Sequence, residues 1–257
     1  MASLVLGIYA GIAHFRRPER RDIAGIALSG AVGITFYNLA LNCGETRVDA
    51  GAAGLLIAST PIWTALLATI TLGERLTIRG WGGVLMSFAG VALIASGEGD
   101  GIHLSPQAVI VLAAAVSSAI YIVLQKHFLS RYSALEFTAY TIWAGTLLML
   151  PWGSGLFQAV RVAPHGGTLA VIYLGVFPGA LAYVAWAYVL CHGTAGRTSS
   201  FLYLTPVLAI AIAWVWLGEV PNMLSLIGSA IALAGVVSLG LWGKTTPAAM
   251  DAAAVDN

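Results

Sequence analysis

Residues 60–91 read TPIWTALLATITLGERLTIRGWGGVLMSFAGV, and residues 205–236 read TPVLAIAIAWVWLGEVPNMLSLIGSAIALAGV. Ten of these 32 positions are identical at a constant offset of 145 residues, and the alignment needs no gap. The shared positions include a Thr-Pro pair, a Leu-Gly-Glu triplet and two glycines in each segment. Chance matching among alanine-rich and glycine-rich helices would not keep this order, so the sequence predicts an internal repeat.

The composition excludes an ordinary soluble domain. Of the 257 residues, 59% are apolar and 9% are charged, against about 45–50% and about 25% in soluble domains. The net charge of +1 offers no basic field for nucleic acid. Two cysteines, Cys43 and Cys191, make no disulfide framework.

Long runs without Asp, Glu, Lys or Arg separate the charged residues. Each run can hold the roughly 20 apolar residues that cross a bilayer, and their frequent alanines and glycines favour helices over barrel strands. We therefore predict an all-α, polytopic transmembrane helical bundle. Its eight expected spans lie near residues 23–42, 51–72, 80–97, 106–126, 135–154, 168–190, 198–217 and 223–242.

Loop charges predict the orientation of these spans. One of the two possible orientations places ten basic residues on the cytoplasmic side and only Arg47 and Arg161 outside, which is the expected positive-inside bias. The C-terminus is then cytoplasmic, and residues 244–257 form a flexible tail. The Leu-Gly-Glu triplets at 72–74 and 217–219 fall on opposite sides, so the two copies are inverted.

The repeat also predicts the domain organisation. Residues 1–100 form the first copy and residues 101–243 the second, which has five helices. By the same offset the first copy lacks its first span and most of its second. We interpret Leu4–Ala13 as the end of that second span.

The duplicated order resembles the EamA branch of the drug/metabolite transporter superfamily. The resemblance rests on Thr60-Pro61, Leu72-Gly73-Glu74-Arg75-Leu76, Gly83 and Gly90, and on their counterparts Pro206, Leu217-Gly218-Glu219, Gly228 and Gly235. It implies two inverted five-helix repeats and an exporter or exchanger of small metabolites in an inner membrane. It also implies alternating access through a central cavity. This chain would then be an N-terminally truncated member, and the alternative is a transport-incompetent fragment acting as a scaffold or assembly partner.

Polar and aromatic residues inside the spans are the candidates for substrate binding. Asn38 and Asn42 share one helical face with Thr35, and an amide facing lipid is costly. That face therefore lies against other helices, through hydrogen bonds, or against a wet cavity. The offset of 145 places Tyr183 at the position of Asn38, with Trp186 about one turn further on.

Proline breaks supply further candidates, because each removes a backbone donor and leaves carbonyls available to line a cavity. Trp63 follows Pro61, Tyr203 precedes Pro206, and Tyr121 lies on a polar stripe of the helix at 106–126. The alternative is a kink with aromatic packing. The complete set of predicted substrate-binding residues is Asn38, Asn42, Trp63, Tyr121, Tyr183, Trp186 and Tyr203.

Glu74 and Glu219 are the acidic residues that both copies share, and each admits two interpretations. A carboxylate of raised pKa could couple transport to protons, or it could cap a neighbouring loop at a helix end. Motifs for zinc proteases, P-loops and paired cysteine ligands are absent from the sequence. We therefore expect no catalytic residues, no metal and no cofactor, and as partners a small-molecule substrate and the lipid bilayer.

Overall fold

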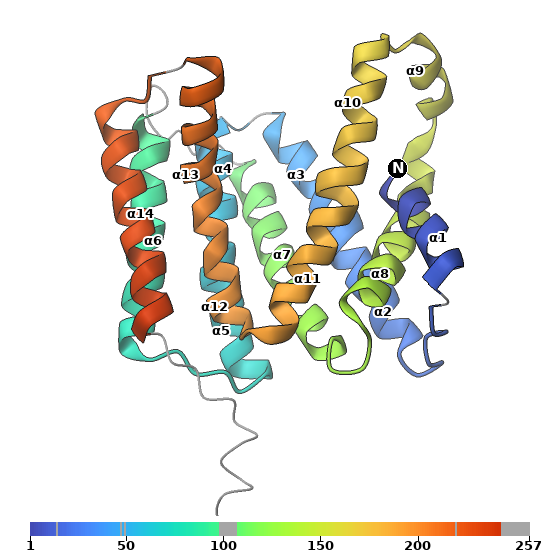
Figure 1. Ribbon diagram of the computed structural model, residues 1–257, viewed down its shortest axis with the longest axis horizontal. Helices are drawn as coiled ribbons and strands as arrows, with labels where there is room; N and C mark the ends of the chain where they lie inside the picture. The colour runs from blue at the N-terminus through green and yellow to red at the C-terminus, as the bar shows by residue number, and fades with distance from the viewer. Residues whose placement is uncertain (14, 47, 49, 98–106, 219, 243–257) are drawn as a thin grey trace, which may run out of the picture. The chain divides into compact units, whose positions relative to one another are not determined.

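The computed structural model describes residues 1–13, 15–46, 48, 50–97, 107–218 and 220–242 (Figure 1). Regular structure in these residues is helical, which confirms the predicted all-α class. Seven of the described helices are long and apolar enough to cross a membrane. They cover Ile23–Glu45, Ala52–Thr71, Ile78–Ser96, Ala108–Phe128, His165–His192, Ala195–Trp216 and Met223–Leu241.

The remaining predicted span, residues 135–154, is shorter than expected. Helix α8 (Ala134–Met149) begins with a capping box between Ser133 and Glu136, in which each residue satisfies a backbone N–H of the other. It ends at Met149 and continues as the four-residue 3-10 turn η2 (Leu150–Gly153). The change follows from Pro151, which lacks the N–H that would continue the α-helix.

The described residues form two compact units, and each takes segments from both predicted copies. Unit 1 comprises residues 1–36 and 124–192. Its elements are α1 (Ala2–Ala13), α2 (Ile23–Gly30), η1 (Ala31–Phe36), the end of α7 (Ala108–Phe128), α8, η2, α9 (Leu156–Val162), α10 (His165–Val176), η3 (Phe177–Ala182) and α11 (Tyr183–His192).

Unit 1 is held by close packing of α2 and η1 against α8. A Cβ atom at Gly30 would lie 2.6 Å from the carbonyl oxygen of Thr141, so only glycine allows this approach. One turn further, the Thr35 hydroxyl donates to the carbonyl of Gly145 at 3.0 Å. This bond satisfies a polar side chain that is 8% exposed.

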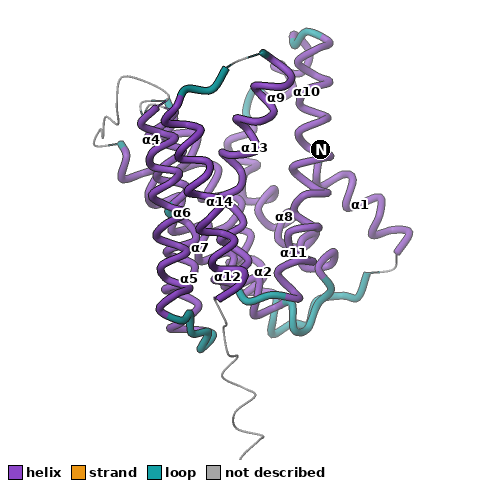
Figure 2. The backbone as a smooth tube through the Cα atoms, turned by 60° about the vertical axis from the view of Figure 1, so that its left-hand side comes forward, coloured by secondary structure: helices purple, strands orange, loops and turns teal. Residues whose placement is uncertain are grey.

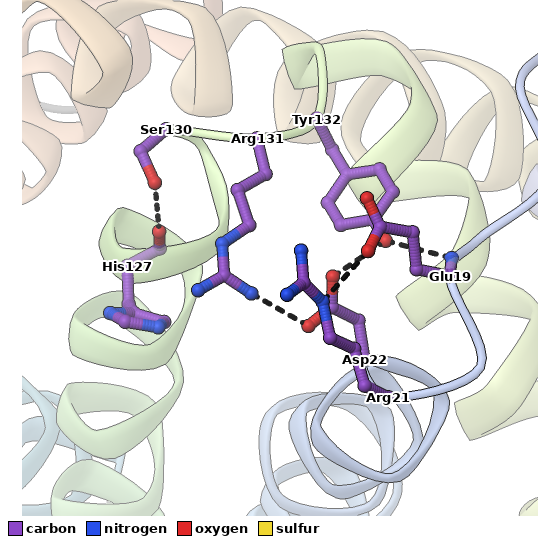
Figure 3. A network of polar contacts seen from close by, with 7 residues as sticks. All are labelled: Glu19, Arg21, Asp22, His127, Ser130, Arg131 and Tyr132. Carbon is purple, nitrogen blue, oxygen red and sulfur yellow. Dashed lines mark hydrogen bonds and ion pairs between the residues drawn. The ribbon is translucent and has the colours of Figure 1, made fainter.

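Hydrogen bonds and an ion pair join the segment before α2 to the loop between α7 and α8 (Figure 3). The buried carboxylate of Asp22 accepts from the Arg131 guanidinium and from the Tyr132 hydroxyl, both at 2.8 Å. The Tyr132 hydroxyl in turn accepts from the backbone N–H of Glu19 at 3.0 Å. Burial raises the pKa of the Tyr132 phenol above its ordinary value of 10.0; the Glu19 bond lowers this pKa, and the Asp22 carboxylate raises it.

Unit 2 comprises residues 37–123 and, after α11, the chain from residue 193 onward. Its described elements are α3 (Tyr37–Glu45), α4 (Ala50–Ala58), α5 (Thr60–Thr71), α6 (Ile78–Gly97), most of α7, α12 (Ala195–Ser199), η4 (Ser200–Tyr203), α13 (Leu204–Ile212), η5 (Ala213–Leu217) and α14 (Met223–Trp242).

Helices α6 and α14 are the last helices of the two predicted copies, and they run side by side (Figure 1 and Figure 2). A Cβ atom at Gly83 would lie 2.8 Å from the carbonyl oxygen of Gly235, and one at Gly228 would lie 2.6 Å from that of Gly90. The offset of 145 converts the first contact into the second, because residue 83 becomes 228 and residue 235 becomes 90. Two antiparallel helices related by a local two-fold axis make contacts of this reciprocal kind.

The centre of this seam carries a direct hydrogen bond between equivalent residues. The hydroxyl of Ser87 donates to the carbonyl of Ala232 at 3.1 Å, and the two positions are 145 residues apart. Around them lies the core of unit 2, which contains Val84, Val91, Tyr203, Ala232, Val236 and Leu239. The equivalent residues of the two helices therefore meet beside a buried apolar cluster of the unit.

Candidate functional site

Two helix breaks in unit 2 place the repeated Thr-Pro pairs. Helix α4 ends at Ala58 and α5 begins at Thr60 with Pro61 in its first turn. In the second copy the 3-10 turn η4 ends at Tyr203, just before Thr205 and Pro206. A proline at 61 or 206 cannot donate to the carbonyl four residues earlier. The equivalent carbonyls of Ile57 and Leu202 therefore lack their regular helical donors.

A cavity of about 400 Å³ lies at these breaks, wholly within unit 2. Its wall is mostly apolar, with polar groups from Tyr37, Thr60, Ser118 and Thr205. None of the described lining residues carries a formal charge. The lining residues are Tyr37, Gly54, Leu55, Ile57, Ala58, Thr60, Val91, Ile94, Ala95, Ser118, Leu202, Thr205 and Pro206.

Both copies contribute equivalent residues to this wall. The offset of 145 pairs Thr60 with Thr205 and Ile57 with Leu202, and all four line the cavity. An apolar body with a few fixed hydroxyl groups is the usual character of a site for a small molecule. The arrangement therefore suits an uncharged or zwitterionic ligand with an apolar portion.

The two asparagines lie on α3, directly after the cavity residue Tyr37. The Asn42 side-chain amide donates to the backbone carbonyl of Asn38 at 2.7 Å, one turn earlier on the same helix. That bond satisfies one donor within the helix. Neither asparagine is among the residues that line the cavity, whereas Tyr37, which we did not predict, is. Its position beside the polar stripe is the signal that the sequence offered.

Trp63 and Tyr121 lie close along the chain to lining residues. The Trp63 indole N–H donates at 3.1 Å to the hydroxyl of Ser59, which itself donates to the carbonyl of Leu56 at 2.6 Å. Trp63 thus satisfies its polar atom at the α4–α5 break. Tyr121 is 4% exposed and lies three residues after Ser118, which lines the cavity.

Tyr203 is fully buried in the core of unit 2. Val91 belongs to the same cluster, Leu55 and Ala58 pack against it, and all three also line the cavity. Tyr203 therefore lies in the layer behind the cavity wall. Within the described part of the chain its hydroxyl has no hydrogen-bond partner.

The other two aromatic candidates lie in unit 1, on α11. Tyr183 and Trp186 are both half-buried. Tyr183 packs against the cluster of Leu6, Ala139 and Ile142. Their assignment to substrate binding stays a prediction.

Glu74 lies where two backbone donors meet its carboxylate. One oxygen accepts from the N–H of Ala195 at 2.9 Å and the other from the N–H of Gly196 at 3.2 Å. The side chain, 7% exposed, thus fixes the start of α12 against the loop after α5, the geometry expected of a structural carboxylate. Its counterpart Glu219 lies outside the described residues.

The equivalent helices α5 and α13 differ in their surroundings. On α5, Thr64, Ala65 and Ala68 are at most 2% exposed, and α12 packs against this helix, with the Cβ position of Gly196 3.5 Å from Ala65. Their counterparts on α13 and η5, residues 209, 210 and 213, line an open hollow of about 320 Å³ together with Asn222 and Ser225. Thr60 is buried while Thr205 is exposed. Equivalent residues are therefore buried in one copy and partly or fully exposed in the other.

An all-helical bundle with seven helices able to cross a membrane, and a cavity at paired helix breaks, defines a polytopic membrane transporter. The sequence matches the EamA-like transporter family over residues 1–96 and 106–241, and the chain belongs to this family. The resemblance drawn from the duplicated motifs is thereby confirmed. The protein is a multi-pass integral membrane protein that transports small molecules, and it is not an enzyme.

Individual relatives agree with this assignment. The chain is 41% identical over 237 residues to the "Probable terminal-alkyne amino-acid exporter" of Streptantibioticus cattleyicolor, which spans 92% of this chain and 80% of the relative. It is 38% identical over 236 residues to "Uncharacterized transporter YdfC" of Bacillus subtilis, with 92% and 77% covered. A solved crystal structure with 22% identity matches with a TM-score of 0.76 over 94% of this chain and 84% of that chain, which shows a shared fold.

Proposed function

We propose that the protein exports a small metabolite by alternating access, using the cavity at the two Thr-Pro breaks. The observation that carries this proposal is the unequal burial of equivalent residues on α5 and α13. In an inverted repeat, exchanging the conformations of the two copies produces a second state that opens to the other side of the membrane. Closure over α5 in one state then becomes closure over α13 in the other.

The positive-inside prediction assigns sides to this proposal. The end of α5 is followed by Arg75 and Arg79, which we place on the cytoplasmic side. The described conformation is then closed to the cytoplasm at α12 and open outward at the hollow beside α13. In the opposite state, residues 50–54 of α4, which the repeat pairs with 195–199, would cover α13. We further propose a cell-membrane location, a cytoplasmic C-terminus, and two inverted copies that divide near residue 100.

For the substrate we propose an amino acid with a small apolar side chain. Two features support this class. The cavity wall combines hydroxyl groups with apolar side chains and has no formal charge among its described residues. The relative with 41% identity is named an exporter of terminal-alkyne amino acids, whose side chains are apolar.

Cysteine accessibility tests the mechanism at the equivalent positions 64 and 209. In a background with Cys43→Ser and Cys191→Ser, Thr64→Cys and Ala209→Cys are labelled from outside with a membrane-impermeant maleimide. Without substrate, the cysteine at 209 should react and that at 64 should stay protected. A substrate that drives the opposite state should slow labelling at 209 and make position 64 reactive to a permeant maleimide. Rates that no substrate changes at either position would refute alternating access.

A further inference from the structure

A groove of about 580 Å³ runs along one flank of the α6–α14 seam. Its described lining consists of Arg79, Gly82 and Met86 from α6 and Ser238 from α14. The three α6 residues are spaced i, i+3 and i+7, so they share one helical face. A Cβ atom at Gly82 would meet no other atom within 4 Å, so the groove is open at that position.

Small residues create this groove beside a tight interface. The neighbouring Gly83 brings the α6 backbone against Gly235 of α14, so little separates the helices along the seam. Gly82 and Ser238, on the flank, are too small to fill the resulting furrow. Beyond Arg79 the described lining, Gly82, Met86 and Ser238, carries no charge, so it can accept an acyl chain.

Positive charge lies at one end of the groove. Arg79 is exposed, and within the described residues its guanidinium makes no ion pair. Arg197 donates at 2.9 Å to the carbonyl of Gly240, in the last turn of α14 and two residues after Ser238. Two guanidinium groups thus lie near the same helix end, and each presents donors that suit a phosphate group.

We propose that this groove binds an anionic phospholipid. The phosphate and headgroup contact Arg79, Arg197 supplies a second positive charge, and one acyl chain lies along Gly82, Met86 and Ser238. The basic end of the groove matches the negative surface of an anionic leaflet, and the apolar remainder matches hydrocarbon. A zwitterionic lipid gains the apolar contact but not the net attraction.

Native mass spectrometry of the purified full chain tests this site. The protein is mixed with equal amounts of phosphatidylglycerol and phosphatidylcholine, and the bound lipid is identified. Wild type should retain phosphatidylglycerol preferentially. Arg79→Gln should reduce this retention about five-fold, the factor expected from one arginine near an anionic surface. Gly82→Leu should reduce retention of both lipids, because its side chain enters the furrow at a position where an added Cβ meets nothing within 4 Å.

Two control variants separate the groove from general effects. Arg75→Gln removes a neighbouring exposed arginine that does not line the groove, and Gly11→Leu enlarges a glycine of α1 whose Cβ position is also open. Both should retain phosphatidylglycerol as wild type does. Equal losses in Arg75→Gln and Arg79→Gln would overturn the proposal.

Two other results would also overturn it. Binding of inorganic phosphate alone, unchanged by Gly82→Leu, together with wild-type lipid retention in that variant, would show a free-anion site. A two-chain mass in wild type that Gly82→Leu abolishes, without any change in lipid retention, would assign the groove to an interface between copies.

Discussion

Adding a single methyl group at Gly90 tests the packing on which unit 2 depends. In Gly90→Ala the new Cβ would lie 2.5 Å from the backbone nitrogen of Ala232, 2.6 Å from the carbonyl oxygen of Gly228 and 2.9 Å from the Cα of Ala232. All three are backbone atoms, so no side chain can rotate away. Helices α6 and α14 must separate by up to about 1 Å, because ordinary contacts begin near 3.4 Å.

The expected cost follows from this geometry. Overpacking a well-packed interior costs about 1–3 kcal/mol, and three simultaneous backbone contacts place Gly90→Ala near the upper end, at about 3 kcal/mol. By the scaling known for soluble chains of 150–250 residues, this lowers Tm by about 6–12 °C. Thermal unfolding of the purified protein in a mild detergent, followed by near-UV circular dichroism, measures the shift.

The chain supplies a matched control on the same helix. Gly82→Ala adds the same methyl group where nothing lies within 4 Å, so its Tm should equal that of wild type or rise slightly, since alanine favours helix by up to about 1 kcal/mol. The repeat adds a second comparison. Gly235→Ala, the counterpart of Gly90→Ala, meets the Gly83 oxygen at 2.6 Å and should destabilise to a similar degree. Equal Tm values for Gly90→Ala and Gly82→Ala would refute the proposed close packing.

The remaining predictions concern side chains. Tyr203→Phe should raise the free energy of unfolding by about 1 kcal/mol in chemical denaturation, because it removes a buried hydroxyl without a described partner; lost transport at wild-type stability would instead show that substrate uses the hydroxyl. Asp22→Asn should lower the free energy of unfolding by about 2 kcal/mol in the same assay, because the hydrogen bonds that Arg131 and Tyr132 donate lose their charged acceptor. Glu19→Gln, whose ion-pair partner is an exposed arginine, should leave the free energy of unfolding almost unchanged. The pKa of the Tyr132 phenol is raised in the folded state. Its contribution to the free energy of unfolding is therefore complete below pH 10 and is lost as pH rises through the raised pKa. Tyr132→Phe should lose less stability than wild type in alkaline titration. Thr205→Val, an isostere at the exposed cavity hydroxyl, should reduce efflux of the substrate amino acid without changing Tm, and unchanged efflux would remove Thr205 from the site.

The sequence predicted the helices well because membrane spans are defined by length and charge alone. The boundary of α8 was less predictable: a charge-free run continues past Met149, and only the local effect of Pro151 ends the α-helix there. The repeat likewise indicated which glycines matter. It pairs Gly83 with Gly228 but Gly82 with Ile227, and in the structure Gly83 meets α14 whereas the Cβ position of Gly82 is open.

A cavity lies beside the two Thr-Pro pairs, where the missing backbone donor of each proline disrupts the helix. Its use as the substrate site stays a prediction. The side chains that face the cavity depend on the rotation of each helix, and a helical stripe such as Asn38 and Asn42 fixes that rotation only to within about one residue. Tyr37, one position away, lines the wall instead.

Under the proposed mechanism, the contacts in unit 2 that follow the internal repeat differ from those that do not in whether they must change during transport. Residue pairs that the repeat operation maps onto each other, such as the glycine pairs of the seam, stay in contact in both states of an exchange. They need not break during transport, and their close packing makes breaking them costly. Contacts that the exchange maps onto a different residue pair, such as the Glu74 carboxylate with the start of α12, should form in one state and open in the other under this mechanism. Glu74→Gln, which keeps the acceptor oxygen but removes the charge, should therefore shift the labelling of Thr64→Cys toward exposure while leaving the α6–α14 seam and its Tm contribution intact. Unchanged labelling at position 64, with transport unaffected, would show that this contact is static and that closure lies elsewhere.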